Sequence, residues 1–465
     1  MTGDELGWIC VWDVWKRRQV YKWHAHPSGS VLELLAIPYR SKPEASRSLT
    51  SIDTTIPITA TQRKPLKHLG LSDHYLVSHG RDYEIHVWDI NTILIKSIKS
   101  GSSLSPASGL PTHTPTPIFS LPVNALNFCK MSTLAIEHPA GIQEWSNDTP
   151  LGRTHRHIYI AVPSPTSTAM IDVYDIVTPE RTFASVGSEN KAPPINVQDK
   201  KWGAAMGIRL FLKKDTSDLT GSEGTLHILV GYEDGSMTLF RERAHVKSKR
   251  SMEVVWTIKC HREPVMAMDI SSDHEYAVSC SSDSLLVKYR LFGQLQGVPE
   301  TIQEPLKTTG VADVKFRNDN RILALAGWDG KIRVFSAKTL KPLAVLQYHR
   351  EGLYCLGFAN VELELKDRIE NETEATVDDQ DDQGDQNKDI SVQSSSQASQ
   401  DIDTQNPPLP MAIDADSDSQ DSDDSDDSDD DSDLEDSLKS RAEWSRRHWL
   451  VAGGKENRIS LWEIY

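Results

Sequence analysis

Side chains that could take part in covalent, phosphate-binding or metal chemistry are present, but their spacing does not match that chemistry. The run AGGKEN (452–457) lacks the upstream glycine spacing of a phosphate-binding loop and leads into a hairpin rather than a helix. Neither an H-E-x-x-H zinc motif nor a G-x-S-x-G nucleophile motif occurs. His155 and His157 stand close together without a cysteine or a pair of carboxylates, so we interpret them as loop histidines. We therefore expect no catalytic residues, no metal and no cofactor.

Length, hydrophobicity and cysteine usage exclude several classes of protein. The chain has 465 residues, of which 38% are hydrophobic, and no run of 18 apolar residues occurs, so we expect no membrane span. The start MTGDELGWICVWD lacks the basic and apolar regions of a signal peptide. The five cysteines are scattered and none forms C-x-x-C, which argues against a disulfide framework or a zinc site. These features predict a reduced intracellular protein.

The formal net charge of -17 comes from one segment. Residues 362–443 hold 29 acidic and 5 basic side chains, which leaves the rest of the chain with a small positive balance. The segment is almost free of aromatic residues and has no apolar period, so it cannot bury enough surface to offset the entropy lost on ordering. We predict that residues 362–443 are disordered. The serines among its aspartates are candidate sites for a kinase that recognises acidic sequences.

The rest of the chain contains repeated short segments in which apolar and polar residues alternate. Such alternation predicts half-buried antiparallel strands, and Gly and Asp in the intervening turns suit tight hairpins. Many of the segments end in an aromatic residue followed by a polar one. The endings are ICVWDV (9–14), IHVWDI (85–90), IDVYDI (171–176), MTLFRE (237–242), LVKYRL (286–291), IRVFSA (332–337) and ISLWEI (459–464).

Units of four strands with a Trp-Asp-like ending resemble the WD40 β-propellers. The resemblance predicts an all-β, seven-bladed WD40 β-propeller, with blades one to seven beginning in residues 1–361. The disordered acidic insertion, 362–443, is expected to interrupt the last blade, and 444–465 to supply its remainder. Because residue 1 already falls in the second strand of blade one, either the ring is incompletely closed or about 40 residues are missing before Met1, and we favour the second interpretation.

The WD40 resemblance also assigns a role to two sets of residues with equal spacing. Each set combines a histidine, a strand serine, a turn aspartate and an aromatic residue, with Ser and Asp four apart and Asp and aromatic six apart. We expect the buried histidine to link Asp to Ser, so that every polar group is satisfied. The sets are His26, Ser78, Asp82, Trp88 and His261, Ser279, Asp283, Tyr289. Blade one departs from the pattern, because Leu6 replaces the usual acidic turn residue.

More specific segments resemble the ASTRA-associated protein 1 family, which is related to the G-protein-β-like proteins of animals. They are TGDELGWICVWDVWKRRQVYKWHAH, LVSHGRDYEIHVWDI, LPVNALNFC and HWLVAGGKENRISLWEIY. The resemblance spans residues 1–465 apart from the insertions. It implies a non-catalytic scaffold subunit of a chromatin-linked assembly in the nucleus, with a cytoplasmic pool left open. The implied partners are kinase co-chaperones, RuvB-like ATPases and a phosphatidylinositol-kinase-like kinase; no membrane or direct nucleic-acid contact is expected.

Two surfaces are candidates for partner binding. The turns between second and third strands are expected to present Arg81, Tyr83, Tyr232, Trp328 and Lys455, because Arg and large aromatics are frequent anchors at interfaces. The alternative is that the aromatic residues only cover the end of the channel. At the opposite end, basic turns at 16–18 and 241–250 are candidates for screening by the acidic insertion. A fully solvated insertion is the simpler interpretation.

Two other functions remain open at this stage. A WD40 substrate receptor of a cullin-type ubiquitin ligase usually carries W-D-x-R at the end of a third strand. Here Ile90-Asn91 follow Trp88-Asp89, and Val14-Trp15 follow Trp12-Asp13, so the arginine is absent in both places. A heterotrimeric G-protein β subunit is a weaker alternative, because the N-terminal coiled-coil helix of that class does not occur.

Overall fold

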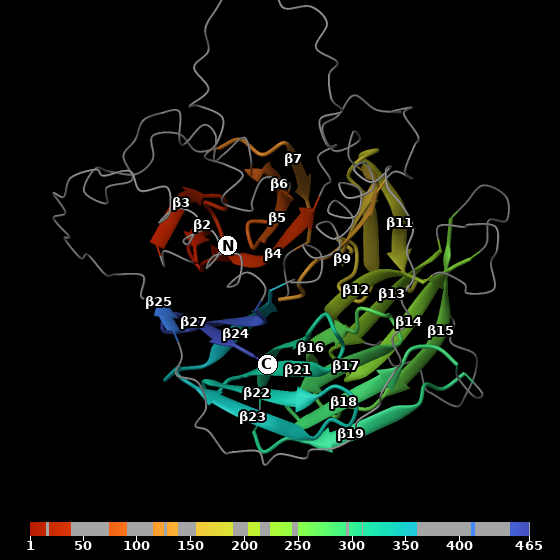
Figure 1. Ribbon diagram of the computed structural model, residues 1–465. Helices are drawn as coiled ribbons and strands as arrows, with labels where there is room; N and C mark the ends of the chain where they lie inside the picture. The colour runs from red at the N-terminus through yellow and green to blue at the C-terminus, as the bar shows by residue number, and fades with distance from the viewer. Residues whose placement is uncertain are drawn as a thin grey trace, which may run out of the picture.

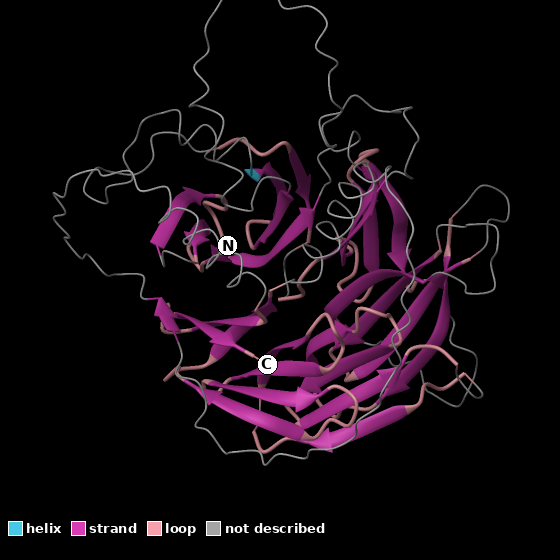
Figure 2. Ribbon diagram, viewed as in Figure 1, coloured by secondary structure: helices cyan, strands magenta, loops and turns pink. Residues whose placement is uncertain are grey.

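The computed structural model describes most of the repeated segments of the chain. The described residues are 1–14, 18–38, 74–90, 115–124, 128–137, 155–188, 203–213, 224–243, 250–293, 297–308, 310–359, 411–413 and 447–464. They form antiparallel sheets that follow one another around a ring in chain order (Figure 1). The regular secondary structure of the described residues is nearly all β-strand (Figure 2).

Each sheet is one blade of a propeller, and six of the seven have four strands. Blade one has three described strands, β1 (Thr2–Gly3), β2 (Trp8–Asp13) and β3 (Arg18–His24). Because β1 lies against β4, as the second strands of other blades lie against the next first strand, these are the second, third and fourth strands of blade one. In order from the first strand to the fourth, the other blades are β4 (Val31–Pro38), β5 (His74–Gly80), β6 (Glu84–Asp89), β7 (Phe119–Pro122); β8 (Ser132–Glu137), β9 (His155–Pro163), β10 (Ile171–Asp175), β11 (Glu180–Val186); β12 (Ala205–Lys213), β13 (Thr225–Tyr232), β14 (Ser236–Glu242), β15 (Met252–Lys259); β16 (Val265–Ile270), β17 (Tyr276–Ser281), β18 (Leu285–Arg290), β19 (Thr301–Pro305); β20 (Val311–Phe316), β21 (Ile322–Gly327), β22 (Lys331–Ser336), β23 (Pro342–Gln347); and β24 (Leu353–Phe358), β26 (Trp449–Gly454), β27 (Ile459–Glu463), β25 (Met411–Ile413).

The core lies between neighbouring blades, because alternate residues of each strand face opposite neighbours. In β5, Leu76 packs with Ile9 and Trp23 of blade one, whereas Val77 packs with Ile158 and other residues of blade three. The strand alternation seen in the sequence is therefore the alternation between two blade-to-blade contacts. This arrangement explains why many strands are buried on both faces.

A β-bulge recurs near the start of the first strand in five blades. The register shifts after Val31, Ala205, Val265, Val311 and Leu353. A bulge re-aims the side chains that follow it. First strands are also joined by side chains: Asp313 Oδ2 accepts a hydrogen bond from the Leu356 amide of the next blade, and Ser132 Oγ accepts one from the Leu210 amide.

The predicted seven-bladed WD40 β-propeller is confirmed, with differences of detail. His155 and His157 lie in β9, so their interpretation as loop histidines was wrong. The alternating run HRHIYIAV extends the strand through them. Within the described residues no helix is long and apolar enough to span a bilayer.

The expected insertion at 362–443 lies outside the described residues except for one short strand. Residues Met411–Ile413 form β25, which pairs antiparallel with β27 and is the fourth strand of blade seven. The tripeptide MAI is an apolar run within an acidic sequence, so it is suited to a strand. Blade one has three strands in the described residues.

Candidate functional site

The turns that join the second and third strands of each blade (the 2–3 turns) stand on interior polar sets. In blade two, His26 Nδ1 lies 2.9 Å from Asp82 Oδ1, and His26 Nε2 lies 2.8 Å from Ser78 Oγ. Trp88 Nε1 donates to the same Ser78 oxygen at 2.9 Å. The structure thus brings together the four residues predicted from their spacing.

The contacts of His26 define its protonation state. Burial lowers the pKa of His26, against the opposing effect of Asp82, so its imidazole is neutral at pH 7. Nδ1–H then donates to the Asp82 carboxylate, and Ser78 Oγ–H donates to Nε2. This assignment satisfies every polar group of the set and fixes the 2–3 turn that carries Asp82.

Blade five repeats this arrangement with tyrosine in place of tryptophan. His261 Nε2 lies 2.7 Å from Ser279 Oγ, and its Nδ1 lies 3.1 Å from Asp283 Oδ1. The Tyr289 hydroxyl is 2.9 Å from Ser279 Oγ. Burial lowers the pKa of His261 despite the neighbouring Asp283.

A third set, in blade seven, was missed by the sequence analysis. His349 Nδ1 lies 2.6 Å from Glu456 Oε1, and His349 Nε2 lies 2.8 Å from Ser460 Oγ, which also accepts from Trp462 Nε1 at 3.0 Å. The serine has moved from the second strand, where Ala452 stands, to the third. The recognisable signal was the histidine itself, which precedes the first strand of its blade as His26 and His261 do.

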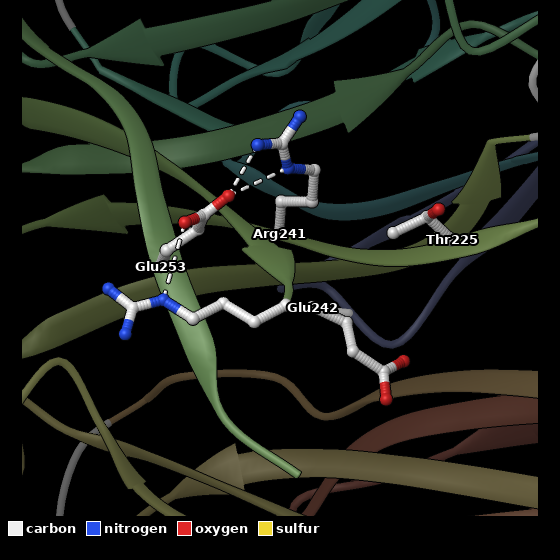
Figure 3. Close-up of a pocket in the computed structure, with 5 residues that line it drawn as sticks. Thr225, Arg241, Glu242 and Glu253 are labelled. Atoms are coloured by element: carbon white, nitrogen blue, oxygen red, sulfur yellow. Dashed lines mark hydrogen bonds and ion pairs between the residues drawn. The ribbon is translucent and has the colours of Figure 1, made fainter. Parts of the chain in front are cut away.

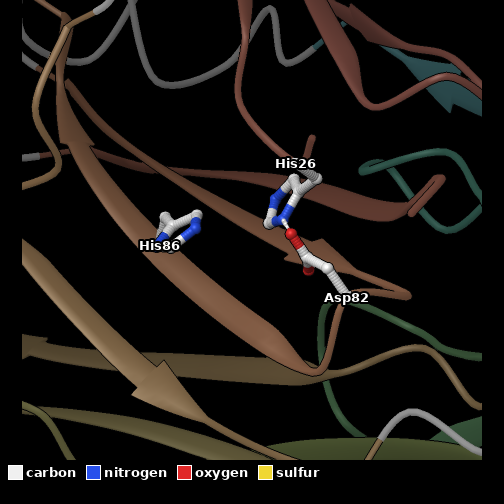
Figure 4. Close-up of side chains that lie close together, drawn as sticks. All are labelled: His26, Asp82 and His86. Carbon is white, nitrogen blue, oxygen red and sulfur yellow. Dashed lines mark hydrogen bonds and ion pairs between the residues drawn. The ribbon is translucent and has the colours of Figure 1, made fainter. Parts of the chain in front are cut away.

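One group of side chains has the residue types of a metal site. Ligand atoms of His26, Asp82 and His86 lie within 4.8 Å of one another (Figure 4). Both nitrogens of His26 already bond to Asp82 and Ser78, and His86 Nδ1 lies 2.8 Å from Ser120 Oγ. These hydrogen bonds account for the positions of all three side chains without a bound ion.

In six blades the 2–3 turn has a left-handed backbone at its last residue or, in blade seven, at its second-last. Glycine is the residue that adopts such a conformation without strain, and Asn and Ser tolerate it better than bulky side chains do. The six residues and their φ angles are Gly7 (81°), Tyr83 (67°), Gly235 (85°), Ser284 (62°), Gly330 (76°) and Asn457 (59°). Tyr83 is therefore the unusual residue of this series.

The predicted partner-binding residues are not all at the surface. Arg81 and Lys455 are exposed, and Tyr83 and Trp328 are about half exposed, at 50% and 48%. All four lie in 2–3 turns. The placement of Tyr232 on this surface was wrong, because it is fully buried between blades three and four. It is the last residue of β13 rather than a turn residue, and β13 is buried on both faces from Leu226 to Tyr232.

The basic residues at the opposite end of blade four are mostly paired within the blade. Arg241 and Arg243 both contact Glu253 beside an open hollow that Thr225 and Glu242 also line (Figure 3). Arg250 pairs with Glu242 and donates to the Tyr159 hydroxyl at 3.0 Å. Lys247, Lys249, Lys16 and Arg17 lie outside the described residues. The described arginines are thus largely neutralised, which weakens the case for an electrostatic contact with the insertion.

Charged side chains of the first strands meet across the centre of the ring. Lys130, just before β8, lies 3.5 Å from Glu33 of blade two and 3.5 Å from Asp313 of blade six. Although burial opposes it, the carboxylates of Asp313 and Glu33 raise the pKa of Lys130 above its usual value. Sequence reasoning missed this cluster, because no local spacing connects residues of three separate blades.

Comparison with known proteins adds to this geometry. A family model described as "WD domain, G-beta repeat" matches residues 252–288 and 301–336, which include most of blades five and six. A protein named ASTRA-associated protein 1 from Penicillium rubens is 27% identical, over all of this chain and 92% of its own length. Its namesake from Aspergillus flavus is 29% identical over 78% of each chain. Guanine nucleotide-binding protein subunit beta-like protein 1 from Mus musculus is 26% identical, over 77% of this chain and 81% of its own length. The resemblance inferred from sequence is confirmed.

Proposed function

We propose that this chain, a WD-repeat β-propeller similar over its full length to ASTRA-associated protein 1, is a non-catalytic scaffold subunit of an ASTRA-type assembly. Its partners would be kinase co-chaperones, RuvB-like ATPases and a phosphatidylinositol-kinase-like kinase, whose maturation it would assist. The place of action would be the nucleus, with a cytoplasmic pool during kinase maturation. The names of the relatives support the association with ASTRA.

The observation that carries the proposal is that the polar sets lie in the interior, whereas large aromatic and arginine side chains are exposed on the 2–3 turns. In blades two, five and seven, the described histidine, serine and acidic side chains beneath the 2–3 turns are engaged in interior hydrogen-bond sets. Large side chains of the kinds that anchor interfaces lie instead on the 2–3 turns, where Arg81, Tyr83 and Trp328 are exposed. A rigid ring that presents anchors at one end is suited to holding partners.

Purification of the tagged full chain from native cells tests the proposal. We expect RuvB-like ATPases and kinase co-chaperones to co-purify in near-stoichiometric amounts, as identified by mass spectrometry. Recovery of a cullin adaptor in their absence would contradict the scaffold proposal and favour a ubiquitin-ligase receptor. A matched purification of an unrelated WD-repeat propeller controls for non-specific capture.

A further inference from the structure

The 2–3 turn of blade two has an exposed tyrosine where the fold favours glycine. Tyr83 holds φ at 67°, and a bulky side chain in this region costs on the order of 1–3 kcal/mol. Tyr83 as a whole is 50% exposed, so this cost is not recovered by burial in the core. Strain of this kind persists where the surrounding structure imposes it, and it is frequent at binding surfaces.

The interior set of blade two imposes the turn. Asp82 is held by His26, and a Cβ on Gly80 would lie 2.2 Å from His26 Nδ1, so the chain can approach the set only with glycine there. The Arg81 amide donates to the Ser30 carbonyl, and the Val123 amide donates to the Tyr83 carbonyl, both at 2.8 Å. The backbone on both sides of the exposed side chains is therefore fixed.

A second aromatic residue completes this surface. Arg81 Cζ lies 4.6 Å from the centroid of the ring of Phe128, a residue that is 67% exposed. Stacking on Phe128 orients the guanidinium and leaves its donors directed to solvent. The nearby carboxylates are engaged elsewhere, Asp82 with His26 and Glu84 with His86. Among the described residues, none forms an ion pair with Arg81.

We propose that Arg81, Tyr83 and Phe128 form a docking corner for a partner segment that places an acidic side chain beside an aliphatic one. The carboxylate would take the guanidinium donors of Arg81 in a charge-assisted contact. The aliphatic side chain would pack against the rings of Tyr83 and Phe128. The proposal rests on the scaffold function and specifies which part of the 2–3-turn surface binds and what chemistry it recognises.

The first test identifies the bound segment by photo-crosslinking. The full chain, with benzoyl-phenylalanine in place of Phe128, is irradiated in native cells and the crosslinked peptide is sequenced. We expect a peptide of a co-purifying assembly member with Asp or Glu within about three residues of an aliphatic residue. A peptide without such a pair, a phosphorylated serine at the contact, or no crosslink while the assembly is still recovered would overturn the proposal.

The second test uses charge reversal and a matched control. Arg81→Glu should lower partner recovery at least tenfold, and reversing the crosslinked acidic residue to Arg should restore it. Arg321→Glu makes the same charge change on an exposed arginine at the opposite end of the propeller, and should leave recovery within twofold of wild type. Equal losses in the two variants, or no rescue by the swap, would contradict the assignment.

The third test separates binding from folding. Tyr83→Gly should raise Tm by about 1–2 °C because it relieves the left-handed tyrosine, yet lower partner recovery at least fivefold. Unchanged recovery would overturn the docking role. If the wild-type chain recovers the assembly and these variants do too, only the docking corner fails. If the wild-type chain recovers no assembly member, the scaffold function itself fails.

Discussion

Lys130 and Asp313 belong to blades three and six, yet their charged groups lie 3.5 Å apart at the centre of the ring. The side chain of Asp313 is buried, with 6% of its surface exposed. Its Oδ2 also accepts a hydrogen bond from the Leu356 amide of blade seven at 3.1 Å. Although burial alone would raise it, Lys130 and Lys315 hold the pKa of Asp313 below its usual value. The contact joins two sides of the propeller that share no strand pairing.

Removing Lys130 should destabilise the ring through the carboxylate that it leaves behind. We expect Lys130→Met to lower the free energy of unfolding by about 1–3 kcal/mol, less than for a fully buried pair because the lysine is 27% exposed. Denaturant unfolding measures this change. In the double variant with Asp313→Asn, part of the loss should be recovered; strictly additive losses would contradict a direct interaction.

Lys455→Met is the matched control for this prediction. Its partner Glu351 lies 3.7 Å away, and both side chains are more than half exposed. A surface pair of this kind contributes roughly 0–1 kcal/mol. A loss equal to that of Lys130→Met would mean that the central position of Lys130 has no special effect.

Blade seven should depend on the serine of its interior set. In Ser460→Ala, His349 Nε2 and Trp462 Nε1 both lose a partner in a buried position. We expect a loss of about 1–3 kcal/mol in the free energy of unfolding. Ser272→Ala, which removes an exposed hydroxyl that bonds to the Asn318 carbonyl, should stay within about 0.5 kcal/mol of wild type. Similar losses in both variants would count against the set.

His79 should make stability depend on pH. Burial lowers the pKa of His79 to about 4, and neither ring nitrogen has a hydrogen-bond partner among the described residues. Because the folded pKa lies below that of the unfolded chain, the unfolded chain is protonated first as pH falls. The contribution of His79 is therefore complete above about pH 6.5 and is lost progressively toward pH 4.

The variant His79→Leu isolates this effect. It should raise the free energy of unfolding at pH 7 by about 1 kcal/mol, because an unpaired buried polar group is replaced by an apolar one. Between pH 6.5 and 5 it should lose about 2 kcal/mol less than wild type. His227, whose pKa burial also lowers to about 4, retains part of the slope. Parallel stability curves for the two proteins would refute the assignment to His79.

Deleting residues 414–443 should leave partner binding unchanged. The deletion removes 15 of the 29 acidic residues of the insertion and keeps β25. The described arginines of blade four, which were candidates for screening, are paired with Glu253 and Glu242. Partner recovery at low and high salt measures the effect. A large change in recovery, or in its salt dependence, would show that the acidic run does take part in binding.

The sequence predicted local features of the fold well. Alternating residues and Gly or Asp turns defined strands such as β17 and β18, because an antiparallel hairpin needs little beyond that pattern. Equal spacing in blades two and five was enough to find two interior sets. The third set was missed because Ser460 contacts His349 from the third strand of its blade, whereas Ser78 and Ser279 lie in second strands. A search with one fixed Ser–Asp spacing does not find a serine in the third strand.

Features that depend on contacts between several blades could not be predicted from local sequence patterns. The cluster at Lys130 requires the ring to close before Glu33 and Asp313 become neighbours. Tyr232 was placed one position too far into its turn, and the buried strand β13 ends at Tyr232, whereas the next residue, Glu233, is exposed. The strain at Tyr83 depends on a backbone angle, and only comparison with Gly7, Gly235 and Gly330 makes it visible.

Hydrogen–deuterium exchange of the free chain and of the purified assembly tests most directly whether partners bind at the 2–3-turn end of the propeller. We expect exchange in peptides that cover the turns at 81–83 and 328–330 to slow at least threefold in the assembly. Peptides that cover the turns at the opposite end, 317–321 and 336–341, should exchange at the same rate in both. Protection confined to the opposite end, or no protection at either, would contradict the proposed scaffold surface.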